Sequence, residues 1–163
     1  MDQAAPELLV ALEGSGLGLA IRQSLWIYPA ANVFHVVGAC LFAGAVAVLD
    51  MALLGVIVAH NRARLIAGSR RWAMVFFALV VSAGAVLFIA EASHVALNTV
   101  FQVKMALIVL GLVNAVWLGG RGMTLAASLP DAAPLPFSAR LAAGLSLAIW
   151  IGVVGLGRFI AYV

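Results

Sequence analysis

Two histidines are the residues of this sequence most suited to binding a metal-containing cofactor. His35 lies inside one long apolar run, and His94 follows directly after the next run. Neutral imidazole nitrogens bind haem iron, and two histidines at similar depth on neighbouring helices can bind it from both faces of the ring. The sequence contains no CxxCH motif, which excludes a covalently attached c-type haem. The pair predicts a haem b with His35 and His94 as its two metal ligands.

Two basic residues are expected at about the same membrane depth as these histidines. Lys104 stands shortly after the start of a third apolar run, and Arg158 stands near the end of the last run. Charged groups at membrane depth are costly and tend to mark functional sites, and cations there can bind the two haem propionates. Gly38 lies one turn from His35 and lets a flat macrocycle, or simply another helix, approach the backbone. We therefore expect Lys104, Arg158 and Gly38 to belong to the same cofactor site.

The other ionisable residues have simpler interpretations. Glu91 can pair with Lys104 or Arg158 for purely structural reasons, and His60 suits a solvated flanking position. Asp50 is expected to form an ion pair or hydrogen bond with a basic residue; the candidates are Arg71, Arg121 and Arg140.

Long apolar segments must position these groups. Each reaches the roughly 20 residues needed to cross about 30 Å of hydrocarbon as a helix. They cover about residues 31–59, 72–93, 99–119 and 139–162. We predict an all-α polytopic membrane protein, an up-down bundle of four transmembrane helices in one domain, 31–163.

The N-terminal segment 1–30 differs from the rest of the chain. Residues 6–28 mix leucines with charged residues, and Gly14, Gly16 and Gly18 interrupt them. This stretch is too weakly apolar to span a membrane. It predicts an interfacial amphipathic helix, broken in two, on the periplasmic side. Pro29 is expected to separate it from the first span.

The basic residues give the orientation. Six of the nine lie in two connections on one side, namely Arg62, Arg64, Arg70, Arg71, Arg121 and Arg140. Positively charged connections stay in the cytoplasm. We therefore expect a protein of the bacterial inner membrane with both termini in the periplasm.

Composition restricts the partners. Of the 163 residues, 66% are hydrophobic and only 9% are charged, so most of the surface must face lipid. The net charge of +3 comes from arginines at the ends of apolar runs, which argues against nucleic acid. The single cysteine, Cys40, excludes an internal disulfide.

The region of about 24–118 resembles a group of uncharacterised bacterial four-span membrane proteins. The resemblance rests on the segment with His35 and Asp50 and on the Phe101-xx-Lys104 pair in FQVKMALIVLGLVNA. This group is distantly similar to copper-resistance D-type and cytochrome b-type inner-membrane proteins. The resemblance implies a four-span fold and either electron transfer through haem b or the handling of copper.

Together these features predict a haem-binding membrane protein or subunit that takes part in electron transfer at the periplasmic side. We expect an accessory or electron-transfer subunit rather than an enzyme, working as a homo-oligomer or within a larger complex. Its redox partner would be a quinone or a periplasmic redox protein. The alternatives are a cofactor-free structural or assembly subunit and a transporter of copper or another small solute.

Overall fold

The structure is a computed structural model and describes residues 5–117, 124–125, 128–131 and 133–160. Every regular element within these residues is a helix. Four helices are long and apolar enough to cross a membrane: α3 (Ile27–Leu54), α4 (Arg62–Ala90), α6 (Thr99–Trp117) and α8 (Phe137–Phe159). The predicted all-α fold with four membrane-spanning helices is therefore confirmed.

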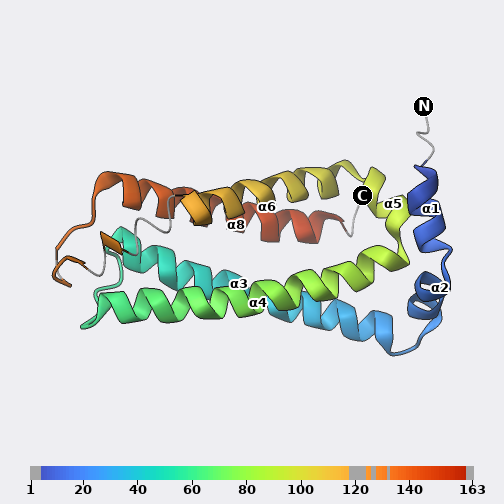
Figure 1. The fold of residues 1–163 in the computed structure, drawn as a ribbon, viewed down its shortest axis with the longest axis horizontal. Helices are drawn as coiled ribbons and strands as arrows, with labels where there is room; N and C mark the ends of the chain where they lie inside the picture. The colour runs from blue at the N-terminus through green and yellow to red at the C-terminus, as the bar shows by residue number, and fades with distance from the viewer. Residues whose placement is uncertain (1–4, 118–123, 126–127, 132, 161–163) are drawn as a thin grey trace.

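The long helices run alternately up and down and form two pairs (Figure 1). Helix α3 packs along α4, and α6 packs along α8. The two pairs meet chiefly where α3 contacts α8. At this contact the ring of Phe42 meets the edge of Trp150, with 4.6 Å between ring centroids. The aromatic contact joins the two halves of the bundle.

Helix α3 differs from the first predicted span at both ends. It begins before Pro29, which occupies the first turn, where its missing N–H would have no helical partner. It ends at Gly55, whose φ of 80° is left-handed and turns the chain out of the helix. The apolar sequence continues beyond Gly55, so hydropathy alone predicts an end of the span that lies beyond the true end of the helix.

Helix α4 begins ten residues before the predicted second span. The segment 60–71 was expected to be a connection, but α4 starts at Arg62. The Asn61 side chain accepts a hydrogen bond from the Arg64 backbone N–H (2.9 Å) and caps this start. Arginine, leucine and alanine are good helix formers, so the arginine-rich segment continues the helix beyond its apolar part.

Arg62 has a structural role that the charge pattern did not indicate. It is 4% exposed, and its guanidinium donates to the carbonyls of Ala133 (2.6 Å) and Pro130 (3.2 Å). Its backbone N–H donates to Asp131 (3.0 Å). Arg62 thus binds the α6–α8 connection onto the start of α4. We call this part of the bundle the arginine end; Arg121 lies outside the described residues.

Three short helices cover the opposite end of the bundle: α1 (Glu7–Glu13), α2 (Gly16–Gln23) and α5 (Ala92–Leu97) (Figure 1). The expected break in the N-terminal segment falls between α1 and α2, where Ser15 caps α2 by accepting from the Gly18 N–H (3.2 Å). We call this part the capped end. That α1 and α2 lie in the membrane interface remains a prediction.

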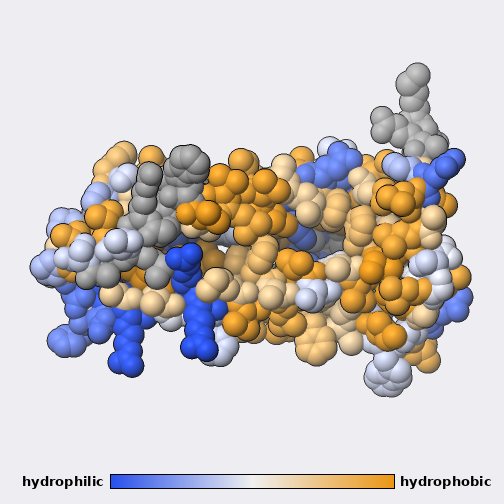
Figure 2. Space-filling model, in the orientation of Figure 1, coloured by the Kyte–Doolittle hydropathy of each residue, from blue (hydrophilic) through white to orange (hydrophobic). Residues whose placement is uncertain are grey.

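The surface between the two ends is apolar. Hydrophilic residues gather toward the ends, and hydrophobic residues cover the middle (Figure 2). Large apolar side chains are exposed on every long helix, for example Val33, Val75, Val109 and Ile151. Exposing so much apolar surface to water would be unfavourable, so lipid must cover it. The chain is a membrane protein.

Packing of Trp150 on α6 can be tested at Gly111. A methyl group at Gly111 would lie 2.8 Å from Cζ2 of Trp150, so the ring or the helix would have to shift. Overpacking costs about 1–3 kcal/mol, and we expect Gly111→Ala to lower the midpoint of thermal unfolding in detergent. Gly144→Ala on α8 is the matched control, because no neighbouring atom lies within 4 Å of its added methyl. Equal midpoints for the two variants would contradict this packing.

Candidate functional site

His35 lies on α3 with its ring against the backbone of α4. Its Nδ1 is 3.0 Å from the carbonyl oxygen of Val80. A methyl group at Gly84 would lie 2.9 Å from Cε1 and 3.1 Å from Nδ1 of this ring, so only glycine leaves room for it. A carbonyl can only accept, so in the neutral ring Nδ1 carries the proton and Nε2 presents its lone pair. Helix α4 thus holds the ring in one tautomer.

Lys104 lies on α6, one turn after Phe101. Asn98 caps the start of α6, accepting from the N–H groups of Val100 (2.9 Å) and Phe101 (3.2 Å). The Phe101 ring stacks on Phe88 of α4, with 5.7 Å between centroids. These contacts fix the first turn of α6 and with it the position of Lys104.

The structure brings Lys104 and His35 together. Lys104 lies near the His35 ring and is half-buried. Its Nζ also lies close to α8, 3.5 Å from where a methyl group at Gly157 would be. Arg158 follows Gly157 and is exposed. Helices α3, α6 and α8 therefore converge on the Lys104 ammonium.

Two other predicted site residues are placed differently. Gly38 faces α4, where an added methyl would lie 3.0 Å from the Val80 side chain and 3.4 Å from Leu79. Of the two roles open to Gly38, this geometry favours the close approach of a helix. His94 lies on α5 and is exposed.

The remaining acids of the capped end hold the short helices. Glu91, where α4 ends and α5 begins, accepts a hydrogen bond from the Tyr28 hydroxyl (3.1 Å). Among the described residues, no ion pair joins Glu91 to Lys104. Glu13 at the end of α1 accepts from the backbone N–H of Ser93 (2.9 Å) and from its hydroxyl, and it also binds Arg22 (3.0 Å). Glu13 therefore ties α1 and α2 to α5.

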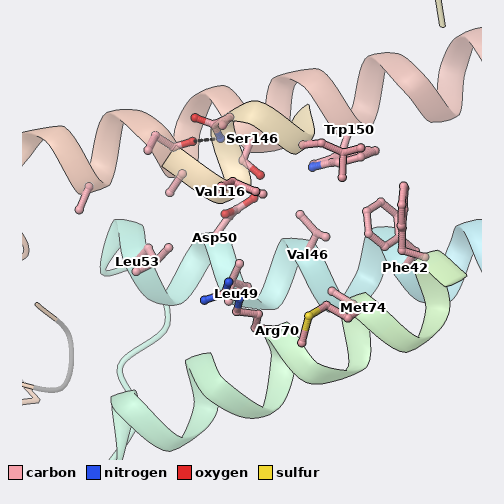
Figure 3. Close-up of a pocket in the computed structure, with 18 residues that line it drawn as sticks. Phe42, Val46, Leu49, Asp50, Leu53, Arg70, Met74, Val116, Ser146 and Trp150 are labelled. Carbon is pink, nitrogen blue, oxygen red and sulfur yellow. Dashed lines mark hydrogen bonds between the residues drawn. The ribbon is translucent and has the colours of Figure 1, made fainter. Parts of the chain in front are cut away.

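A second cluster of polar side chains lies in the middle of the bundle, around Asp50. Asp50 is 2% exposed, and its side chain faces that of Ser146 on α8 (Figure 3). The sequence predicts an arginine partner for Asp50 instead. Asn114 of α6 and Asp50 line one cavity, and Asn114 donates a hydrogen bond to the Ala142 carbonyl (3.0 Å).

Sequence reasoning missed Asn114 and Ser146. The available signal was a polar side chain inside an apolar run, as in LGLVNAVW and GLSLAIW. It also missed the pairing of Glu13 with Ser93, because these residues are 80 positions apart in the chain. Within the described part of the chain, no group of three or more His, Cys, Asp or Glu residues is arranged to hold a metal ion.

Comparison with known proteins gives one family. A model described as "Family of unknown function (DUF6644)" matches residues 12–163. No curated protein and no solved structure matches the chain. This agrees with the expected uncharacterised family, and it gives no link to copper-resistance D-type or cytochrome b-type proteins.

The Glu13 contacts predict a pH dependence. The hydrogen bond from the Ser93 hydroxyl, with help from the Ser93 N–H and Arg22, holds the pKa of the Glu13 carboxyl below its usual value. A lowered pKa stabilises the folded arrangement at neutral pH, and this stabilisation is lost as the pH falls through the lowered value. We expect amide hydrogen exchange in α1 and α2, corrected for the intrinsic rate, to stay slow at about pH 5 and to accelerate in more acidic solution.

The variant Glu13→Gln should show the faster exchange already at neutral pH. Glu7→Gln removes an exposed carboxylate from the same helix and is the control, with exchange like that of the wild type. Slow exchange in Glu13→Gln at neutral pH would show that Glu13 does not hold these helices.

Proposed function

The chain belongs to this family of unknown function, and we propose that it binds haem b near the capped end and takes part in electron transfer there. The observation that carries the proposal is the His35 ring, whose Nδ1 faces the Val80 carbonyl. Metal-binding histidines usually donate their second ring N–H to a carbonyl or carboxylate, which orients the ring and makes the other nitrogen a better ligand. His35 is arranged in this way, with Nε2 left for iron.

The charge of Lys104 supports the same proposal. Within the described residues no carboxylate lies within ion-pair distance of its ammonium. A half-buried cation is costly without an anion, and a haem propionate would supply one. Arg158, one residue beyond the Gly157 that Lys104 approaches, is suited to the second propionate.

The packing of α3 and α4 limits where the macrocycle lies. The space at Gly38 is filled by Val80 and Leu79, and the space at Gly84 is filled by the His35 ring. We therefore propose that the macrocycle lies on the side of α3 that faces α6 and α8, within reach of Lys104. His94 of α5 remains the proposed second ligand; its exposed ring would turn toward the iron when haem binds.

Bound haem would supply a one-electron carrier, and the protein would provide its ligands and compensating charges. The arginine pattern orients the capped end toward the periplasm of a bacterial inner membrane. The partner proposed for this end is a quinone or a periplasmic redox protein, with the chain acting as a homo-oligomer or as a subunit of a larger complex.

A cofactor-free structural subunit is the second candidate. The hydrogen bonds of Glu13 with Ser93 and of Tyr28 with Glu91 favour it, because they use polar groups of the capped end for packing alone.

Visible spectroscopy tests the haem proposal. Protein made with ample haem and purified in mild detergent should show α and Soret bands in a reduced-minus-oxidised spectrum. His35→Ala should abolish them, since iron loses its oriented ligand, and His94→Ala should abolish the bis-histidine spectrum. Lys104→Met should lower the affinity for haem about tenfold, the lower end of the range for lost supporting contacts.

The control is His60→Ala at the exposed connection before α4, which should leave the bands unchanged. A wild-type protein without bands and without iron would overturn the proposal in favour of the structural subunit. Stoichiometric copper without iron would favour the transporter of copper.

A further inference from the structure

A cavity of about 230 Å³ lies in the middle of the bundle, between all four long helices. Figure 3 shows its walls, with Asp50 and Ser146 facing each other and Phe42 and Trp150 farther along. Most of the lining is apolar; the polar side chains on it are Asp50, Arg70, Asn114 and Ser146. Neither His35 nor Lys104 lines this cavity, so it is separate from the proposed haem site.

Two oxygen atoms at this cavity are buried without a hydrogen-bond partner, Oδ2 of Asp50 and Oδ1 of Asn114. The Nδ2 of Asn114 donates to the Ala142 carbonyl, and the Ser146 side chain faces Asp50. Buried acceptors of this kind are rare in folded proteins and call for a donor. The cavity therefore presents acceptors to any molecule that enters it.

Charge on the walls selects a neutral molecule. The lining contains one acidic and one basic residue, Asp50 and Arg70, and therefore no excess of either formal charge. An added cation would leave a net charge in surroundings of low dielectric constant, which is strongly unfavourable. A neutral hydroxyl group supplies the missing donor without adding charge.

The apolar walls suit an aromatic ring. The rings of Trp150 and Phe42 form a T-shaped contact, and the ring centroids of Trp150 and Phe77 are 6.2 Å apart. Ser146 and Trp150 are one turn apart on α8, about 6 Å along the axis, which matches the length of a substituted benzene ring. An apolar cavity of about 150 Å³ already holds benzene, and this cavity is larger.

We propose that this cavity binds a small neutral phenol. Its hydroxyl donates to Oδ2 of Asp50 or Oδ1 of Asn114, and its ring lies along the wall formed by Val46, Met74 and Trp150. The apolar body lets such a molecule reach the cavity from the bilayer, and the hydroxyl distinguishes it from the hydrocarbon chains around it.

The probes are 4-fluorophenol and fluorobenzene, which differ only in the hydroxyl group. Their fluorine-19 NMR signals are followed with the protein in lipid nanodiscs, and empty nanodiscs correct for partition into lipid. We expect saturable broadening of 4-fluorophenol that unlabelled phenol reverses. Its affinity should exceed that of fluorobenzene about tenfold, as expected for a hydrogen bond to an otherwise unpartnered buried acceptor.

The variants Asp50→Leu and Asn114→Leu keep the side-chain shape and remove the acceptors. Removing the acceptor that binds the hydroxyl, or both acceptors in the double variant, should lower the affinity for 4-fluorophenol about tenfold and leave fluorobenzene binding in place, which also shows that the cavity persists. Glu7→Gln is the control for loss of an exposed carboxylate and should bind as the wild type does. Equal affinity of the wild type for both probes, or no saturable signal, would overturn the proposal, and this comparison requires no variant.

Discussion

The contact of α3 with α8 is the interaction on which the rest of this bundle depends. It joins two helix pairs whose long helices otherwise make few contacts with each other. The contact consists of Phe42 and Trp150 in the centre and of apolar side chains toward the arginine end. Because α3 carries both His35 and Asp50, the same contact positions both polar sites. Movement of α3 against α8 would change the distance from His35 to Lys104 and the shape of the Asp50 cavity together.

Polar groups inside this apolar bundle fall into two classes. Some form hydrogen bonds that hold the fold, such as those of the Arg62 guanidinium with the α6–α8 connection and of Glu13 with Ser93. Others are held in place but keep an unused bonding capacity, such as the His35 ring, the Lys104 ammonium and the two unpartnered oxygens. The second class is costly for the folded protein in low dielectric surroundings, which is why we assign function to it.

Apolar length predicted the number and type of the long helices, because crossing a membrane requires long helical segments whatever their packing. Length could not show that α3 ends at Gly55 or that α4 starts at Arg62, since both depend on local backbone conformation and capping. Apolar length also could not predict that Asp50 faces Ser146. Helices apolar on all sides lack the periodicity that shows which face points inward, so contacts between them come only from the assembled bundle.

Both polar sites depend on a bundle that crosses the membrane with its arginine end and capped end on opposite sides. Cysteine labelling tests this directly, with Gln23→Cys in α2 and His60→Cys before α4, each in a Cys40→Ala background, since both sites are exposed. In intact spheroplasts a membrane-impermeant maleimide should label Gln23→Cys, and it should label His60→Cys only after the membrane is opened. Labelling of both positions from the same side would contradict the account.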